Sequence, residues 1–187
     1  MPMPEIPDLS AMSLAEVAAA AEAATLPPVD TWHPVNSGDS MMRIAADGTW
    51  FHDGGPITRP NMVRLFSTIL RCEEDGSYVL VTPAEKLSIE VEDVPFQAVE
   101  VKIEGEGTAR CLAFRLNTGD LVVADAGHPL RFAGTEYAPA PYVMVRGGME
   151  ARLSRAVYYE LAEIALAEGA TPPGVWSEGV FFAMIAE

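Results

Sequence analysis

The sequence predicts an α+β protein of two related small domains, each a mostly antiparallel sheet with one packed helix. Three observations support this fold class. The middle of the chain alternates apolar and polar residues, which is typical of strands with one solvated face. Two amphipathic helical segments flank this region, and a pattern of strand, Gly-Gly turn and Arg-started helix occurs on either side of it.

The first copy of this pattern begins with a β-hairpin. Strand-like segments at 41–45 and 49–52 flank Asp47-Gly48, a dipeptide that tolerates the positive φ of a two-residue turn. Gly54-Gly55 then turns the chain into an amphipathic helix expected at about 59–71. A short strand is expected after that helix.

The second copy repeats these elements in the same order. A strand at 142–146 runs into Gly147-Gly148, a helix begins at Ser154-Arg155, and a strand is expected at 179–185. The Gly-Gly pair recurs 93 positions later (54 to 147) and the helix-starting Arg 96 positions later (59 to 155). We interpret the two copies as the product of a duplication with three extra residues in the second.

Three alternating segments lie between the copies and predict antiparallel strands with one wet face: 87–91, 99–103 and 112–116. The same alternation places Glu90 and Glu92 on a solvated face, where they act as surface carboxylates instead of acid/base catalysts.

We divide the chain into three parts. Residues 1–30 hold a tail and an Ala-rich helix, which a capping box of Ser13 and Glu16 begins and Pro27-Pro28 ends. The first α+β unit is expected at 31–83 and the second, larger unit at 84–187. The N-terminal helix has a thin apolar face, so we expect it to pack on the rest of the protein or on a partner.

The charge balance excludes two classes of partner. Twelve basic residues against 27 acidic ones give a net charge of -15, which repels phosphate backbones and anionic lipids at long range. We therefore expect no nucleic-acid and no membrane partner. The start of the chain carries no basic residue before Arg43 and no apolar run reaches the length of a membrane span, so we expect a cytoplasmic protein.

The sequence contains no recognisable catalytic or metal-binding pattern. Two of the three histidines, His33 and His128, precede prolines, which is typical of turn residues. No helix-spaced His pair and no Cys-x-x-Cys occurs. We predict no catalytic residue, no metal and no cofactor. A hydrolase using Cys72 or Cys111 with a distant His is the weakest of the alternatives.

Several short segments occur in a particular order along the chain: Gly38-Asp39 with Met42-Arg43-Ile44, Asp47 to Phe51, Arg59-Pro60 with Leu65-Phe66, Val81 to Lys86, Val91 to Phe96, His128 to Leu130, and Gly174 to Ser177. Taken together, they resemble a bacterial family known as domain of unknown function number 1285. The resemblance covers about 32–182, although Met41 stands where the family often has an acid. It implies a duplicated two-domain core, a second domain similar to pleckstrin-homology-like folds, and a role in signal transduction through a nucleotide-like ligand between the domains.

Arg59 and Arg155 are the sharpest candidates for ligand binding. A cation at a helix N-terminus opposes the helix dipole, and the same unfavourable placement occurs twice. A bound phosphate or carboxylate would accept hydrogen bonds from the guanidinium and the free helix amides together. The alternative is an ordinary ion pair with a nearby carboxylate.

Our leading interpretation is a non-enzymatic sensor or regulatory module that binds a small anionic, nucleotide-like ligand at the cleft between the domains. The expected ligand-binding residues are Arg59, Arg155, Arg43, Lys86, Gly54, Gly55, Gly147 and Gly148. The alternative is a protein-protein interaction adaptor that holds a protein partner on a sheet edge or on the N-terminal helix.

Overall fold

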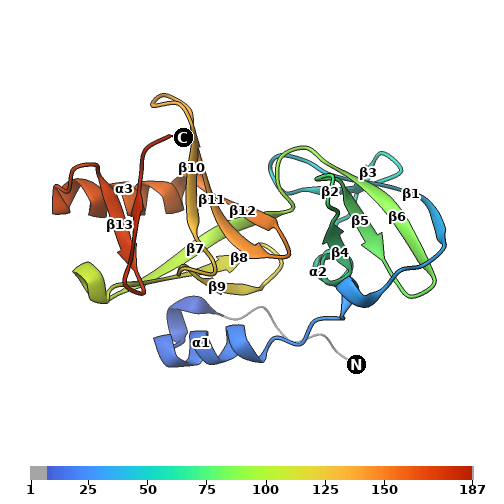
Figure 1. Cartoon of the computed structure of the whole chain (residues 1–187), viewed down its shortest axis with the longest axis horizontal. Coiled ribbons are helices and arrows are strands. Elements are labelled where there is room, and N and C mark those ends of the chain that lie inside the picture. Colours follow the sequence, from blue (N-terminus) through green and yellow to red (C-terminus); the bar gives the residue numbers. More distant parts are fainter. Residues whose placement is uncertain (1–7, 187) are drawn as a thin grey trace.

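Two six-stranded sheets form the body of the protein, and each domain also contains a helix (Figure 1). The structure is a computed structural model that describes residues 8–186. The first domain holds β1 Asn36–Ile44, β2 Trp50–His52, β3 Gly55–Pro56, α2 Pro60–Thr68, β4 Leu70–Cys72, β5 Tyr78–Val81 and β6 Glu85–Val91. The second holds β7 Phe96–Glu104, β8 Cys111–Leu116, β9 Leu121–Val123, β10 Leu130–Gly134, β11 Pro139–Arg146, β12 Met149–Leu153, α3 Arg155–Glu168, β13 Gly174–Ser177 and β14 Val180–Ala183.

The two sheets have the same strand order. The first runs β3-β2-β1-β6-β5-β4 and the second β10-β11-β12-β7-β8-β9, so in each the first strand in the chain lies beside the last. This central pair is parallel in both sheets, β1 with β6 and β7 with β12, and the other neighbours are antiparallel. The α+β class and the duplicated, mostly antiparallel architecture are therefore confirmed.

The duplication does not align the Gly-Gly turns as the sequence predicted. Gly54 lies in the turn between β2 and β3, and Gly147-Gly148 lies between β11 and β12. In the shared strand order β3 is an edge strand whereas β12 is central. The helices also differ, because α2 lies between the third and fourth strands and α3 follows the sixth. Glycines with positive φ occur in many tight hairpin turns. Their recurrence therefore indicates a similar type of turn, and it does not show that the two turns occupy equivalent positions in the two domains.

Two boundaries differ from expectation. The helix predicted at about 59–71 ends at Thr68, because Leu70 to Cys72 form β4 and pair with β5. Leu70 is 1% exposed in that strand. The first sheet also continues to Val91, beyond residue 83, because β6 is hydrogen-bonded between β1 and β5. Apolar alternation alone cannot show which of two neighbouring sheets a strand joins.

One hydrophobic core connects both domains. The first domain contributes Trp50, Leu70 and Ile44 to this core. The second domain contributes Phe96, Phe114 and Leu116 to the same cluster. α3 packs on this core through Val157, Leu161 and Ala165. None of the helices in the described part of the chain is both long and apolar enough to cross a membrane.

The N-terminal segment lies across the second domain. α1 (Leu14–Ala23) begins with the expected capping box, in which the Ser13 amide donates to Glu16 at 2.7 Å and the Glu16 amide donates to the Ser13 hydroxyl at 3.3 Å. The helix packs beside β9 (Figure 1), and Val17 is its only fully buried residue. The thin apolar face predicted from the sequence is thus the face that meets the sheet.

A buried arginine holds the C-terminal end of α3. Arg110 is 5% exposed and its guanidinium pairs with Glu168, the last residue of the helix. A cation at this end also complements the helix dipole. The Nε and one Nη atom of Arg110 have no hydrogen-bond partner among residues 8–186, and within that range Glu168 is the carboxylate that pairs with the buried charge. Its hydrogen bond with Arg110 lowers the pKa of Glu168 below the ordinary value.

We expect Glu168→Gln to lower the free energy of unfolding at pH 7 by about 3 kcal/mol, because it leaves the Arg110 charge buried without a counter-charge. Since the pKa of Glu168 is depressed in the folded chain, its contribution is present at neutral pH and is lost as the pH falls below 4.5. Urea unfolding at pH 7 and in acid measures this. Glu163→Gln on the exposed face of the same helix is the control, and a deficit that stays constant with pH would contradict the prediction.

Candidate functional site

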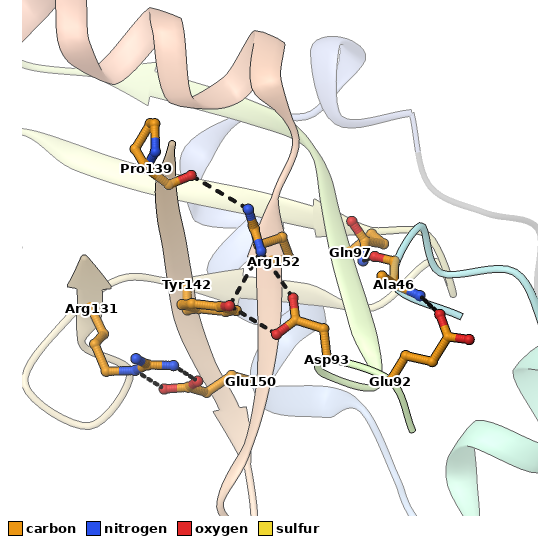
Figure 2. Close-up of polar contacts among 9 residues, drawn as sticks. All are labelled: Ala46, Glu92, Asp93, Gln97, Arg131, Pro139, Tyr142, Glu150 and Arg152. Atoms are coloured by element: carbon orange, nitrogen blue, oxygen red, sulfur yellow. Dashed lines mark hydrogen bonds and ion pairs between the residues drawn. The ribbon is translucent and has the colours of Figure 1, made fainter. Parts of the chain in front are cut away.

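The connection between the domains is held by polar contacts on both sides (Figure 2). Glu92, just after β6, accepts a hydrogen bond from the Ala46 amide at 2.9 Å, and the Gln97 side chain donates to the Ala46 carbonyl at 3.1 Å. Gly48, in the same turn, has φ of 88°, and a side chain there would meet Gln97. The β1–β2 turn of the first domain is therefore locked against the second.

Asp93 joins this connection to the second sheet (Figure 2). Its carboxylate accepts from the Tyr142 hydroxyl at 2.8 Å and from Arg152 at 3.1 Å. Burial first, and the hydrogen bond to Asp93 second, raise the pKa of Tyr142. Beside them the Arg131 guanidinium pairs with Glu150 at 2.6 Å and lies 4.3 Å from the centre of the Tyr142 ring. These groups satisfy one another, so we assign Asp93, Tyr142 and Arg152 to holding the interdomain connection against the second sheet.

Arg146, at the end of β11, lies where the domains and the N-terminal segment meet. Its guanidinium donates to the carbonyl of Ser67 at 3.0 Å, near the end of α2, and lies 5.0 Å from the centre of the Phe96 ring. The nearest carboxylate, on Asp120, is 3.8 Å away. Burial lowers the pKa of Arg146, and Asp120 offsets this only in part. The guanidinium is thus a partly desolvated cation with a long ion pair to Asp120.

Two cavities adjoin Arg146, and both are bordered by the N-terminal segment. The larger has a volume of about 770 Å³ and lies between α1 and the second sheet. The smaller, of about 190 Å³, lies between the domains under Pro27-Pro28. Leu26 and Arg146 line both. We call the two cavities together the Arg146 crevice.

The two parts of the crevice differ in charge. The smaller cavity is lined by Arg71 and Arg146 against one carboxylate, Asp30. The larger is lined by Arg146 and His128 against four carboxylates, those of Glu22, Asp120, Asp125 and Glu178. An anionic group therefore fits the smaller cavity, while the larger favours an uncharged body that donates hydrogen bonds.

The predicted ligand residues are not gathered in this crevice, apart from Gly147. Arg59 is the exposed N-cap of α2 and Arg155 the exposed first residue of α3, so they belong to different domains (Figure 1). Neither lines the Arg146 crevice. Gly148 lies beside Gly147 in the same turn, and Gly54 and Gly55 belong to the hairpin at the far edge of the first sheet.

Arg43 and Lys86 lie on the central strands of the first sheet. Arg43 pairs with Glu92 and lies over the Phe51 ring, 4.3 Å from its centre. It therefore forms the ordinary ion pair that we considered as the alternative for the helix-starting arginines. Lys86 aligns with Ser37 on β1, six residues before Arg43 along that strand. The two cations are separated along the sheet.

Sequence reasoning missed Arg71 and Arg146. Arg71 lay at the end of the expected helix, where it had the pattern of a surface residue; in β4 it instead donates to the carbonyls of Val29 and Trp32 at 2.7 and 2.8 Å. Arg146 directly precedes the Gly147-Gly148 turn. This position next to the glycine turn was the sequence feature that could have identified Arg146 as a binding residue, because a ligand can approach the backbone closely at glycines.

The larger cavity also brings together Cys111, Asp125 and His128, the residue types of a cysteine hydrolase. The Asp125 carboxylate lies 3.1 Å from Nδ1 of His128. However, burial and then the neighbouring Glu178 raise the pKa of Cys111 to about 12. At neutral pH the thiol is protonated, whereas the nucleophile of such enzymes is the thiolate. Within residues 8–186 no three His, Cys, Asp or Glu side chains are grouped as metal ligands.

The matched strand order of the sheets and the shared core define a duplicated two-domain α+β protein. The chain belongs to the DUF1285 family: the N-terminal domain of unknown function of that family matches residues 27–94 and its C-terminal domain matches residues 95–184. The family boundary between 94 and 95 coincides with the passage from the first sheet to the second.

Two solved structures of the same family resemble this chain. A DUF1285 protein from Silicibacter pomeroyi DSS-3 is 45% identical, covers 91% of this chain and 94% of its own, and has a TM-score of 0.79. One from Shewanella baltica OS155 is 26% identical, covers 67% of this chain and 92% of its own, and has a TM-score of 0.53. No protein with a curated description matches the chain.

The raised pKa of Cys111 predicts an unreactive thiol. At pH 8 we expect iodoacetamide to leave Cys111 unmodified in the folded protein, because the thiol is 3% exposed and its pKa is about 12. The half-buried Cys72 reacts first, and both react in urea. Mass spectrometry over a pH series, with Cys72→Ser as control, measures this. Modification of Cys111 with a midpoint at or below pH 9 would return it to the candidates for a nucleophile.

Proposed function

We propose that the protein is a non-enzymatic sensor or regulatory module that binds a small anionic, nucleotide-like ligand in the Arg146 crevice. The observation that carries the proposal is the half-buried Arg146 guanidinium, which lines both cavities and whose ion pair with Asp120 is long, at 3.8 Å. This keeps the function expected from the sequence and moves its site from the helix starts to the domain junction.

The smaller cavity supports the anionic part of the ligand. A partly buried cation is costly unless it is closely paired. The ion pair of Arg146 with Asp120 is long, and the carbonyl of Ser67 accepts a hydrogen bond from Arg146 without neutralising its charge. Arg71 adds a second guanidinium to the same wall, although it already pairs with Glu73 at 2.8 Å, so Arg146 is the main anchor for the anion. A volume of about 190 Å³ suits one phosphate or carboxylate group and not a whole nucleotide.

The larger cavity supports the body of the ligand. Its volume of about 770 Å³ lies within the range of small-molecule sites, and its walls are largely aliphatic side chains of α1, β9 and β11. Carboxylates at its edge, including Asp120 and Asp125, are acceptors for ring or exocyclic N–H groups. A ring with such donors, joined to one anionic group beside Arg146, satisfies both parts of the crevice.

The N-terminal segment supports a regulatory role. α1 buries only Val17 fully, and the chain from Leu26 to Val29 borders the smaller cavity. A ligand in the crevice would contact this weakly packed segment and both domains at once, so binding would change the stability of the segment's attachment. We infer signal transduction from a cytoplasmic metabolite as the role of that change.

A thermal-shift screen of nucleotides and phosphorylated metabolites tests the proposal. A compound at one hundred times its Kd stabilises the folded chain by about 2.7 kcal/mol, which for a protein of this size raises Tm by roughly 5–10 °C. We expect Arg146→Met to abolish the shift while its circular dichroism stays that of the parent protein. Arg59→Ala and Arg155→Ala remove exposed arginines outside the crevice and serve as controls that keep the shift.

The same series separates the possible sites. A shift that survives Arg146→Met and disappears in Arg59→Ala or Arg155→Ala would return the ligand to the helix starts. No shift from any compound, at concentrations that reach the millimolar range, would contradict a nucleotide-like ligand. Isothermal titration of each compound that shifts Tm then gives the stoichiometry.

A further inference from the structure

The first domain contains a separate cavity of about 450 Å³ between its sheet and α2. Its walls are apolar side chains from the sheet, including Met42, Leu80 and Leu87, and from α2 and its two ends, including Ile57, Phe66 and Ile69. None of its lining residues also lines the Arg146 crevice. It is therefore a second, independent feature of the fold.

The cavity leaves the core of the first domain incompletely filled. Ile57, Phe66, Ile69 and Leu87 are only half-buried, although each faces the interior of the sheet and helix. Other side chains of this domain, such as Ile44 and Trp50, are almost completely buried. The space under α2 is therefore a local apolar cavity beside a closed core.

The polar groups at the edge of this cavity define the chemistry of a ligand head group. The Ser40 hydroxyl donates to the Ser88 carbonyl at 2.7 Å, and the Thr82 hydroxyl contacts the amide of Glu85 at 3.2 Å. Among the described residues, the side chains of His52 and Glu85 have no partner, and neither Lys nor Arg lines the cavity. A carboxylate and an imidazole at the opening accept hydrogen bonds, and Glu85 repels an anion.

We propose that this cavity binds an apolar molecule that ends in a hydroxyl or an amine. The apolar body replaces water against the half-buried aliphatic and aromatic walls, which is the driving force for binding. The head group donates a hydrogen bond to Glu85, with His52 as a second acceptor at the opening. A fatty acid with its carboxylate at the same place is disfavoured because no cation faces it.

A neutral fluorescent probe of apolar sites, N-phenyl-1-naphthylamine, tests the cavity directly. We expect a saturable rise in its fluorescence with the full chain, and about tenfold weaker binding by Met62→Trp, because the indole occupies the cavity opening. Leu65→Trp is the matched control: Leu65 is exposed on the same helix and does not line the cavity. Both positions are exposed, and circular dichroism verifies that each variant folds.

Competition against the probe tests the head group. Decylamine and 1-decanol should displace it at lower concentration than decanoate at pH 8, and Glu85→Gln should reduce the preference for decylamine over decanoate several-fold. Glu90→Gln, on the opposite face of the same strand, is the control. A linear, unsaturable rise in fluorescence, or equal binding by the Met62→Trp and Leu65→Trp proteins, overturns the site. Preferential displacement by decanoate overturns the assigned head group.

Arg146→Met separates this proposal from the function proposed above. We expect it to leave binding of the naphthylamine probe unchanged, because Arg146 does not line the cavity. Met62→Trp should in turn leave any thermal shift caused by nucleotides unchanged. Loss of probe binding in Arg146→Met would place the probe in the crevice and overturn the assignment to the first domain.

Discussion

The parallel pairing of the first strand with the last strand is the constraint on which both domains depend. β1 pairs with β6, which follows 49 residues later in the chain where Asn36 is aligned with Glu85, and β7 pairs with β12 in the same parallel way. Such long-range pairs carry a large loop-closure cost, and the core around Trp50 and Phe96 offsets it. Because this pairing places the end of β6 beside β1, the chain leaves the first domain from its centre and not from an edge.

That exit point determines the domain junction. The connection from β6 to β7 is short, so Glu92 and Asp93 lie between the domains and each binds a different one. Glu92 holds the β1–β2 turn through the Ala46 amide, and Asp93 holds the second sheet through Tyr142 and Arg152. The junction is therefore held by hydrogen bonds on this side. The crevice lies where Arg146 meets Ser67 and the N-terminal segment supplies the remaining wall.

The strongly acidic chain is compatible with the cationic lining of the smaller cavity. The net charge of -15 acts at long range and slows the approach of anions, whereas Arg71 and Arg146 act within a few ångströms in a desolvated space. Salt screens the first effect more than the second. These two effects together favour a small anion that can enter the crevice. The negative potential of the whole chain repels extended polyanions.

The sequence by itself determined the features that depend on neighbouring residues: the hairpin at Asp47-Gly48, the capping box of α1, the amphipathic start of α2, and the overall α+β class. It also indicated a duplication, although the Gly-Gly turns that suggested it do not occupy equivalent places in the two sheets. Local turn chemistry is readable because it involves only a few consecutive residues.

Only the tertiary structure determined which basic side chains line the same cavity. Arg71 and Arg146 are 75 positions apart in the chain (71 to 146) and share a cavity only because the two domains pack through the end of α2. Arg59 and Arg155 stood out in the sequence because each lies at the start of a predicted helix. In the structure these helices belong to different domains. Charge, burial and cavity shape arise from long-range packing, which no pattern of neighbouring residues contains.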